Sequence, residues 1–118
     1  MMKLDELIRL TGAKDMTPEA PKDKEVTCGY TCDLLSWVMA HGKAGMAWIT
    51  VQTHMNVIAV ASLMEMAAVL IPEDIEMEEA TLEKAKEEGI CVLQSSKTAF
   101  ELCALMSEAG LPGSPREE

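Results

Sequence analysis

The sequence predicts an α/β domain with a mostly parallel, four-stranded sheet flanked by helices. Short apolar runs rich in β-forming residues alternate with helical segments between residues 25 and 110. This alternation is typical of parallel strands joined by right-handed crossovers. Continuous apolar runs such as AAVLI at 67–71 indicate strands that are covered on both faces. A chain of 118 residues with 48% hydrophobic residues suffices for one domain with a substantial core.

The N-terminal region, residues 1–24, is expected to form a helix and then a loop. Apolar residues at helical spacing predict a helix over residues 3–10, and Gly12 follows it as an end signal. Two prolines between residues 13 and 24 favour a loop.

The regular domain is expected over residues 25–110, and residues 111–118 are expected to form a flexible tail. The predicted elements are strand 26–30, helix 32–42, strand 47–51, helix 54–65, strand 67–71, helix 78–88, strand 90–93 and helix 97–109. The glycines at positions 42, 89 and 110 fall where three of these helices end.

The predicted helix 54–65 has almost no polar face, because seven of its residues between positions 57 and 64 are apolar. A helix that is apolar all round is normally buried. A small four-stranded domain rarely covers such a helix alone. We therefore expect a homodimer that forms through helix 54–65.

The net charge of −10 restricts the partners that this chain can have. An acidic surface repels phosphate backbones and anionic lipid, so we expect no nucleic-acid binding and no membrane docking. The longest apolar stretch, residues 57–71, is too short to span a bilayer, and the acidic N-terminus does not resemble a signal peptide. The four cysteines lack the spacing of a secreted disulfide framework, so we expect reduced thiols in a cytoplasmic protein.

Polar residues follow each predicted strand and would meet at one edge of a parallel sheet. Ligands bind in such folds at the carboxyl edge of the sheet. The residues that we expect to bind a small ligand there are Asp33, Thr53, His54, Asn56, Ser95 and Ser96. The alternative is that Thr53 or Ser96 only caps the helix that follows it.

The sequence gives little support for catalysis. No nucleophile can be paired with His54 by spacing, and no second histidine lies near it. Cys28 and Cys32 form a C-x3-C pair rather than the C-x2-C of zinc sites, so we expect no metal site. Residues 95–98 end like a phosphate-binding loop but lack both of its glycines. We expect no cofactor and no enzyme activity, with one alternative: Cys32 in the first turn of a helix would be a reactive thiol.

Three segments resemble the DRTGG domain family. They are DLLSxVM at 33–39, WITVQTHxNVxAVA at 48–61 and ExTLEKAxxEGI at 79–90. This module precedes the kinase domain in some HPr kinase/phosphorylase proteins, and it also occurs alone or beside nucleotide-sensing CBS domains. The D-R-T-G-G string itself is absent here, so no role of that string is carried over.

The resemblance implies a fold akin to the N-terminal domains of HPr kinase and of MurE/MurF-type ligases. It also implies a non-catalytic regulatory or sensory domain that binds a small metabolite, such as a nucleotide. Stand-alone versions similar to this chain occur near hydrogenase and redox genes. The alternative function is therefore a structural or regulatory partner of a redox enzyme complex that docks through an apolar helix.

Overall fold

A computed structural model describes residues 2–114 of the chain. Its centre is a five-stranded sheet with the strand order β2-β7-β6-β5-β4, in which β4 to β7 are parallel and β2 is antiparallel to β7. The strands of this sheet are β2 (Lys14–Asp15), β4 (Cys28–Thr31), β5 (Met46–Ile49), β6 (Ala68–Ile71) and β7 (Cys91–Gln94). The predicted α/β class with a mostly parallel sheet is thus confirmed.

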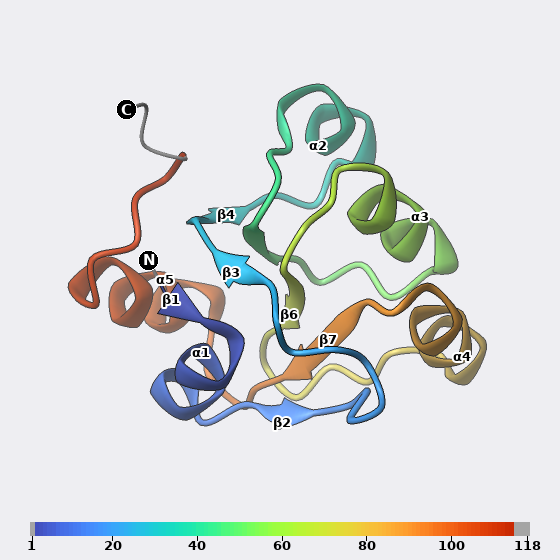
Figure 1. The fold of residues 1–118 in the computed structure, drawn as a ribbon, viewed down its shortest axis with the longest axis horizontal. Helices are drawn as coiled ribbons and strands as arrows, with labels where there is room; N and C mark the ends of the chain where they lie inside the picture. Colours follow the sequence, from blue (N-terminus) through green and yellow to red (C-terminus); the bar gives the residue numbers. More distant parts are fainter. Residues whose placement is uncertain (1, 115–118) are drawn as a thin grey trace.

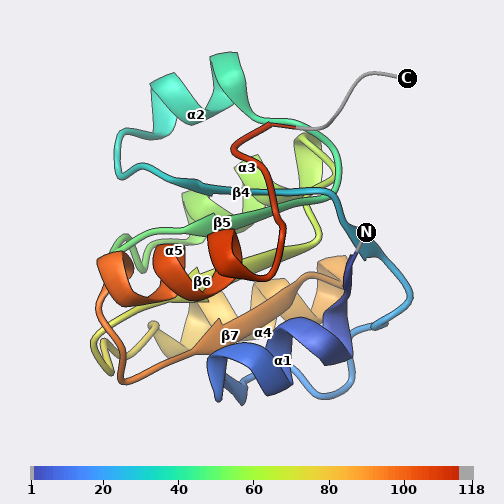
Figure 2. The same cartoon turned by 90° about the vertical axis from the view of Figure 1, so that its left-hand side faces the viewer.

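Helices cover both faces of this sheet (Figure 1). The helices α2 (Leu35–His41), α3 (Met55–Leu63) and α4 (Glu79–Glu88) lie on one face, and α1 (Leu4–Thr11) and α5 (Ala99–Glu108) lie on the other. Each face encloses its own apolar cluster. Residues along each central strand therefore face two cores in turn: Trp48 packs toward α3, whereas Ala47 and Ile49 pack toward α1 and α5. Figure 2 shows the same layers from the side, with α2 next to the edge strand β4.

The sheet has one more strand than the sequence predicts. The expected loop over residues 13–24 contains β2, which pairs Lys14 with Gln94 and Asp15 with Leu93. A second, two-stranded ribbon joins β1 (Met2–Lys3) to β3 (Glu25–Val26). Strands of two residues are too short to show an alternating pattern, so only their long-range pairing defines them.

The helix expected from residue 32 begins later, at Leu35. The cause is that pairing between β4 and β5 continues past Thr31, since the Cys32 N–H donates to the Ile49 carbonyl at 3.2 Å. Asp33 then bonds to the β5 loop, so the chain turns into α2 only after this contact.

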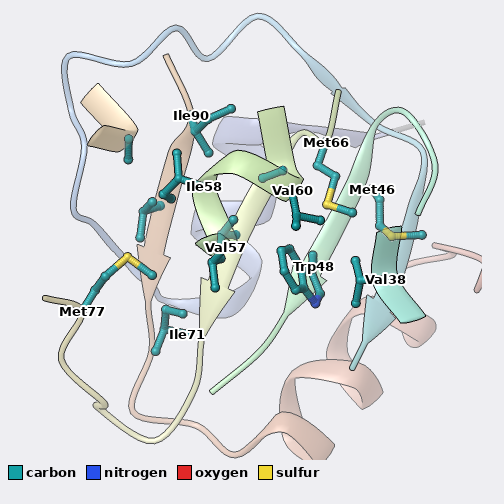
Figure 3. Packing of buried hydrophobic residues seen from close by; sticks show 14 of the residues in the cluster. Val38, Met46, Trp48, Val57, Ile58, Val60, Met66, Ile71, Met77 and Ile90 are labelled. Atoms are coloured by element: carbon teal, nitrogen blue, oxygen red, sulfur yellow. The ribbon is translucent and has the colours of Figure 1, made fainter. Parts of the chain in front are cut away.

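The helix α3 is only partly buried by its own domain, which agrees with the expectation that a small domain rarely covers such a helix alone. Val57, Ile58 and Val60 point toward the sheet and pack with Trp48 and Ile71 (Figure 3). Burying each such side chain contributes about 1.5–3 kcal/mol.

The opposite side of α3 is exposed. Met55, Ala59 and Leu63, spaced four residues apart, face away from the core. The sheet and the neighbouring helices therefore leave an apolar stripe on this helix uncovered.

None of the helices within residues 2–114 is both long enough and apolar enough to cross a membrane.

Candidate functional site

Asp33 joins the ends of β4 and β5 at the carboxyl edge of the sheet. Its Oδ1 atom accepts hydrogen bonds from the Thr50 hydroxyl at 2.8 Å and from the Val51 N–H at 2.9 Å. The Gln52 side-chain amide donates to the Asp33 carbonyl at 3.0 Å. One carboxylate oxygen of Asp33 therefore links the end of β4 to the end of β5. The position of Asp33 in the sequence did not reveal this structural role.

His54 and Asn56 lie at the start of α3 and are exposed. His54 is the N-cap residue, and its Nδ1 atom accepts a hydrogen bond from the Asn56 N–H at 3.3 Å. The alternative that Thr53 caps this helix is therefore wrong, because the cap is His54. The carbonyl of Thr53 accepts a 2.8 Å bond from the buried Thr81 hydroxyl, which fixes this loop to α4.

Ser95 and Ser96 follow β7 at the same edge and differ in exposure. Ser95 is buried, and its hydroxyl accepts a hydrogen bond from the Lys97 N–H at 3.1 Å. Ser96 is exposed. The cap of α5 is Thr98 rather than Ser96, and it forms a reciprocal capping box with Glu101.

The loop after β6 is bonded to the loop after β7. The N–H groups of Glu73 and Asp74 donate to the carbonyls of Lys97 and Ser95, both at 2.8 Å. Both acidic residues have positive φ angles, 59° and 54°, and both are exposed. Non-glycine residues rarely adopt this conformation. Here both residues that adopt it also donate a backbone hydrogen bond to the loop after β7.

The six predicted residues therefore share one edge but form two groups. Asp33, Thr53, His54 and Asn56 surround the ends of β4 and β5, whereas Ser95 and Ser96 follow β7. Two strand spacings separate β5 from β7 and three separate β4 from β7, which corresponds to about 10–14 Å. A ligand that touches both groups must be extended and must pass the carboxylates after β6.

Two surface hollows lie outside this group of six residues. One, of about 470 Å³, runs between β4 and α5 beneath the C-terminal segment, and its lining includes Thr31, Cys103, Met106 and Pro112. Sequence reasoning missed it, because residues far apart in the chain form its walls.

The second hollow, of about 530 Å³, lies where β2 and β7 approach α4. Three acidic side chains and Lys14 line its mouth. The acidic ones are Glu76, Glu78 and Glu79. Residues 2–114 contain no group of three or more His, Cys, Asp or Glu side chains that could hold a metal ion.

All four cysteines are free thiols. Burial raises the pKa of the Cys91 thiol to about 11 and also raises the pKa values of Cys28 and Cys103. Cys32 precedes the first turn of α2, and its Sγ atom lies 3.8 Å from the Leu34 carbonyl. The expectation of a thiol inside the first turn of that helix is therefore wrong, because α2 begins only at Leu35.

The chain has the fold of a DRTGG-like domain. It is similar to the solved CBS and DRTGG domains of the regulatory region of Clostridium perfringens pyrophosphatase, a structure complexed with its activator, diadenosine tetraphosphate. The TM-score is 0.71 at 14% sequence identity, over 95% of this chain and 48% of that chain. The chain thus spans about half the length of that solved chain, which is a regulatory region rather than a catalytic domain. No protein-family model and no curated protein matches the chain.

Proposed function

We propose that this chain is a non-catalytic regulatory domain that binds a small nucleotide at the carboxyl edge of its sheet. The observation that carries the proposal is the likeness of the fold to a regulatory region that binds an activator nucleotide. The polar loops at this edge support it further, because ligands of parallel α/β sheets bind at the carboxyl ends of the strands.

The proposed contacts follow from the two groups of residues at this edge. His54 and Asn56 would select a base or ribose by hydrogen bonding, since both side chains are exposed at the start of α3. Thr53 belongs to the same loop, and Asp33 would offer the carboxylate oxygen that its contacts with Thr50 and Val51 leave free.

Phosphate groups would bind nearer to β7. Ser95, Ser96 and Lys97 precede α5, whose N-terminus carries partial positive charge. The acidic residues Glu73 and Asp74, on the neighbouring loop after β6, oppose this attraction. A span of about 10–14 Å between the two groups suits an extended nucleotide.

A thermal-unfolding screen tests the proposal. Diadenosine tetraphosphate, ATP, ADP, AMP and a UDP-sugar would be added one at a time to the purified chain. A ligand at a hundredfold excess over its Kd stabilises the folded state by about 2.7 kcal/mol. We expect at least one nucleotide to raise Tm, and titration calorimetry then gives its affinity.

Single substitutions place the bound ligand. Asn56→Ala and Ser96→Ala remove exposed polar groups on the two sides of the proposed site, and we expect each to weaken binding about five- to tenfold. Ser107→Ala is the matched control, because Ser107 is also exposed but lines the hollow between β4 and α5. Binding that is weakened by the control and not by the other two would contradict the proposed site. No Tm increase with any of the nucleotides would contradict the proposed function.

A further inference from the structure

One face of the molecule, formed by α2, α3 and the loop before α3, carries almost no charge. The chain has 20 acidic residues, yet none falls between residues 34 and 64, where Lys43 is the only lysine or arginine. Carboxylates are instead frequent on α4 and occur in the first turns of α1 and α5. We call the outer surface of residues 34–63 the α2–α3 face.

The same face gathers the exposed apolar side chains. Six of the seven large hydrophobic residues that are exposed within residues 2–114 belong to it, and the seventh, Phe100, lies on α5. The six are Leu34, Trp37, Met39, Val51, Met55 and Leu63. The two helices pack side by side, as Figures 1 and 2 both show. Monomeric soluble proteins rarely expose contiguous apolar patches larger than a few hundred Å².

The tryptophan of this face is exposed but held in place. The indole N–H of Trp37 donates to the Tyr30 hydroxyl at 2.9 Å, and its ring stacks on the His41 ring at a centroid distance of 4.1 Å. The His41 Nδ1 atom lies 2.9 Å from the Trp37 carbonyl. A side chain that is already ordered loses little conformational entropy when a partner covers it, and such tryptophans often dominate binding energies.

We propose that a second copy of this chain docks on the α2–α3 face to form a symmetric homodimer. Two copies that each carry a net charge of −10 repel one another, and contact through this face keeps the carboxylates of both copies away from the interface. A two-fold axis places the same patch on both sides, which suits a surface that is apolar rather than charged.

The size of the face also suits a dimer. From their exposed fractions, its six apolar side chains offer on the order of 600 Å², against roughly 800 Å² per partner in a standard interface. The small residues between these side chains and a polar rim would supply the rest. The expectation of a dimer through helix 54–65 alone is thereby revised: one side of α3 packs on its own sheet, and α2 with Trp37 supplies a large part of the interface.

Sedimentation equilibrium at micromolar concentration, with reductant present, tests the proposal. We expect a mass of twice the 12.9 kDa of one chain. Leu34→Glu and Leu63→Glu each place a carboxylate in the face at a residue that is 61% and 66% exposed, so folding should tolerate them. Each should weaken dimerisation at least about tenfold, because the new charges of both copies lose water in the interface.

The matched control is Phe100→Glu, which makes the same kind of change at a residue that is 83% exposed outside the face. It should leave the dimer intact. Far-UV circular dichroism verifies folding, and either leucine variant suffices if the other does not fold. A monomeric wild type, or leucine variants that dimerise as strongly as the control, would overturn the proposal. The test does not depend on the proposed nucleotide binding, because mass is measured without ligand.

Discussion

The contact between Asp33 and Thr50 gives the sharpest test of how the edge of the sheet is held. Asp33→Ala removes an acceptor of two hydrogen bonds, one from the Thr50 hydroxyl at 2.8 Å and one from the Val51 N–H at 2.9 Å. Hydrogen bonds to a charged group contribute about 1.5–3 kcal/mol each, and less when the group is exposed as Asp33 is. We expect Asp33→Ala to lower the free energy of unfolding by about 2 kcal/mol, or Tm by roughly 5–10 °C.

Urea unfolding of a double-mutant cycle measures this contact directly. Thr50→Val removes the hydroxyl from a buried side chain and keeps its shape. The cycle of Asp33→Ala, Thr50→Val and both together should give a coupling energy of about 1 kcal/mol. Asp23→Ala is the matched control, because Asp23 is exposed and has no side-chain hydrogen bond within residues 2–114; it should change stability by less than about 0.5 kcal/mol. A coupling energy near zero, or a control that destabilises as much as Asp33→Ala, would refute this reasoning.

Three further outcomes are expected from the hydrogen bonds and pKa shifts of buried and capping groups. Thr17→Val should cost about 1–3 kcal/mol in urea unfolding, because the buried hydroxyl donates to one backbone carbonyl at 3.1 Å and accepts from one N–H at 2.9 Å beside β7; Thr17→Ser, which keeps the hydroxyl, should lose clearly less. Burial raises the pKa of Cys91 from 9.0 in the unfolded chain to about 11 in the folded one. Its contribution to stability is therefore complete below pH 9, and on the order of 2 kcal/mol of the free energy of unfolding is lost as the pH rises from 9 to 11. The free energy of unfolding of Cys91→Ala should therefore depend less on pH over this range than that of the wild type. An equal dependence in the two proteins would count against the buried thiol. Hydrogen bonds from Thr98 lower the pKa of Glu101 below 4.5, so its contribution is complete above pH 4.5 and is lost as the pH falls through the lowered value; an NMR titration in which Glu101 titrates at or above 4.5 would contradict this.

The main strands and helices could be predicted because their signals are local. The runs that became β5, β6 and β7 are continuous and apolar, and glycines with positive φ angles end α1 and α4. β2 could not be predicted, since two residues carry no period and only pairing with β7 defines them. The start of α2 was missed for a similar reason, because a long-range bond from Cys32 to Ile49 delays it.

The candidate site was predictable as an edge but not as an arrangement. Strand ends followed by polar residues indicate which loops meet, and these loops do lie at one edge of the parallel sheet. The bond from Thr81 to the Thr53 carbonyl, and the bonds that join the loops after β6 and β7, link residues that are distant in sequence. Such links decide which oxygen atoms stay free for a ligand, and no local pattern records them.

The outer edges of the sheet have a consequence for solubility. The segment after α5 covers part of β4, since the Pro112 carbonyl accepts a hydrogen bond from the Gly29 N–H at 2.9 Å. At the opposite edge, β2 is only two residues long. One edge strand is short and the other is partly covered, so the sheet exposes few unpaired backbone groups to which a strand of another molecule could bond. Shortening the chain to end before Leu111 would uncover β4, and aggregation by strand addition would then begin at that edge.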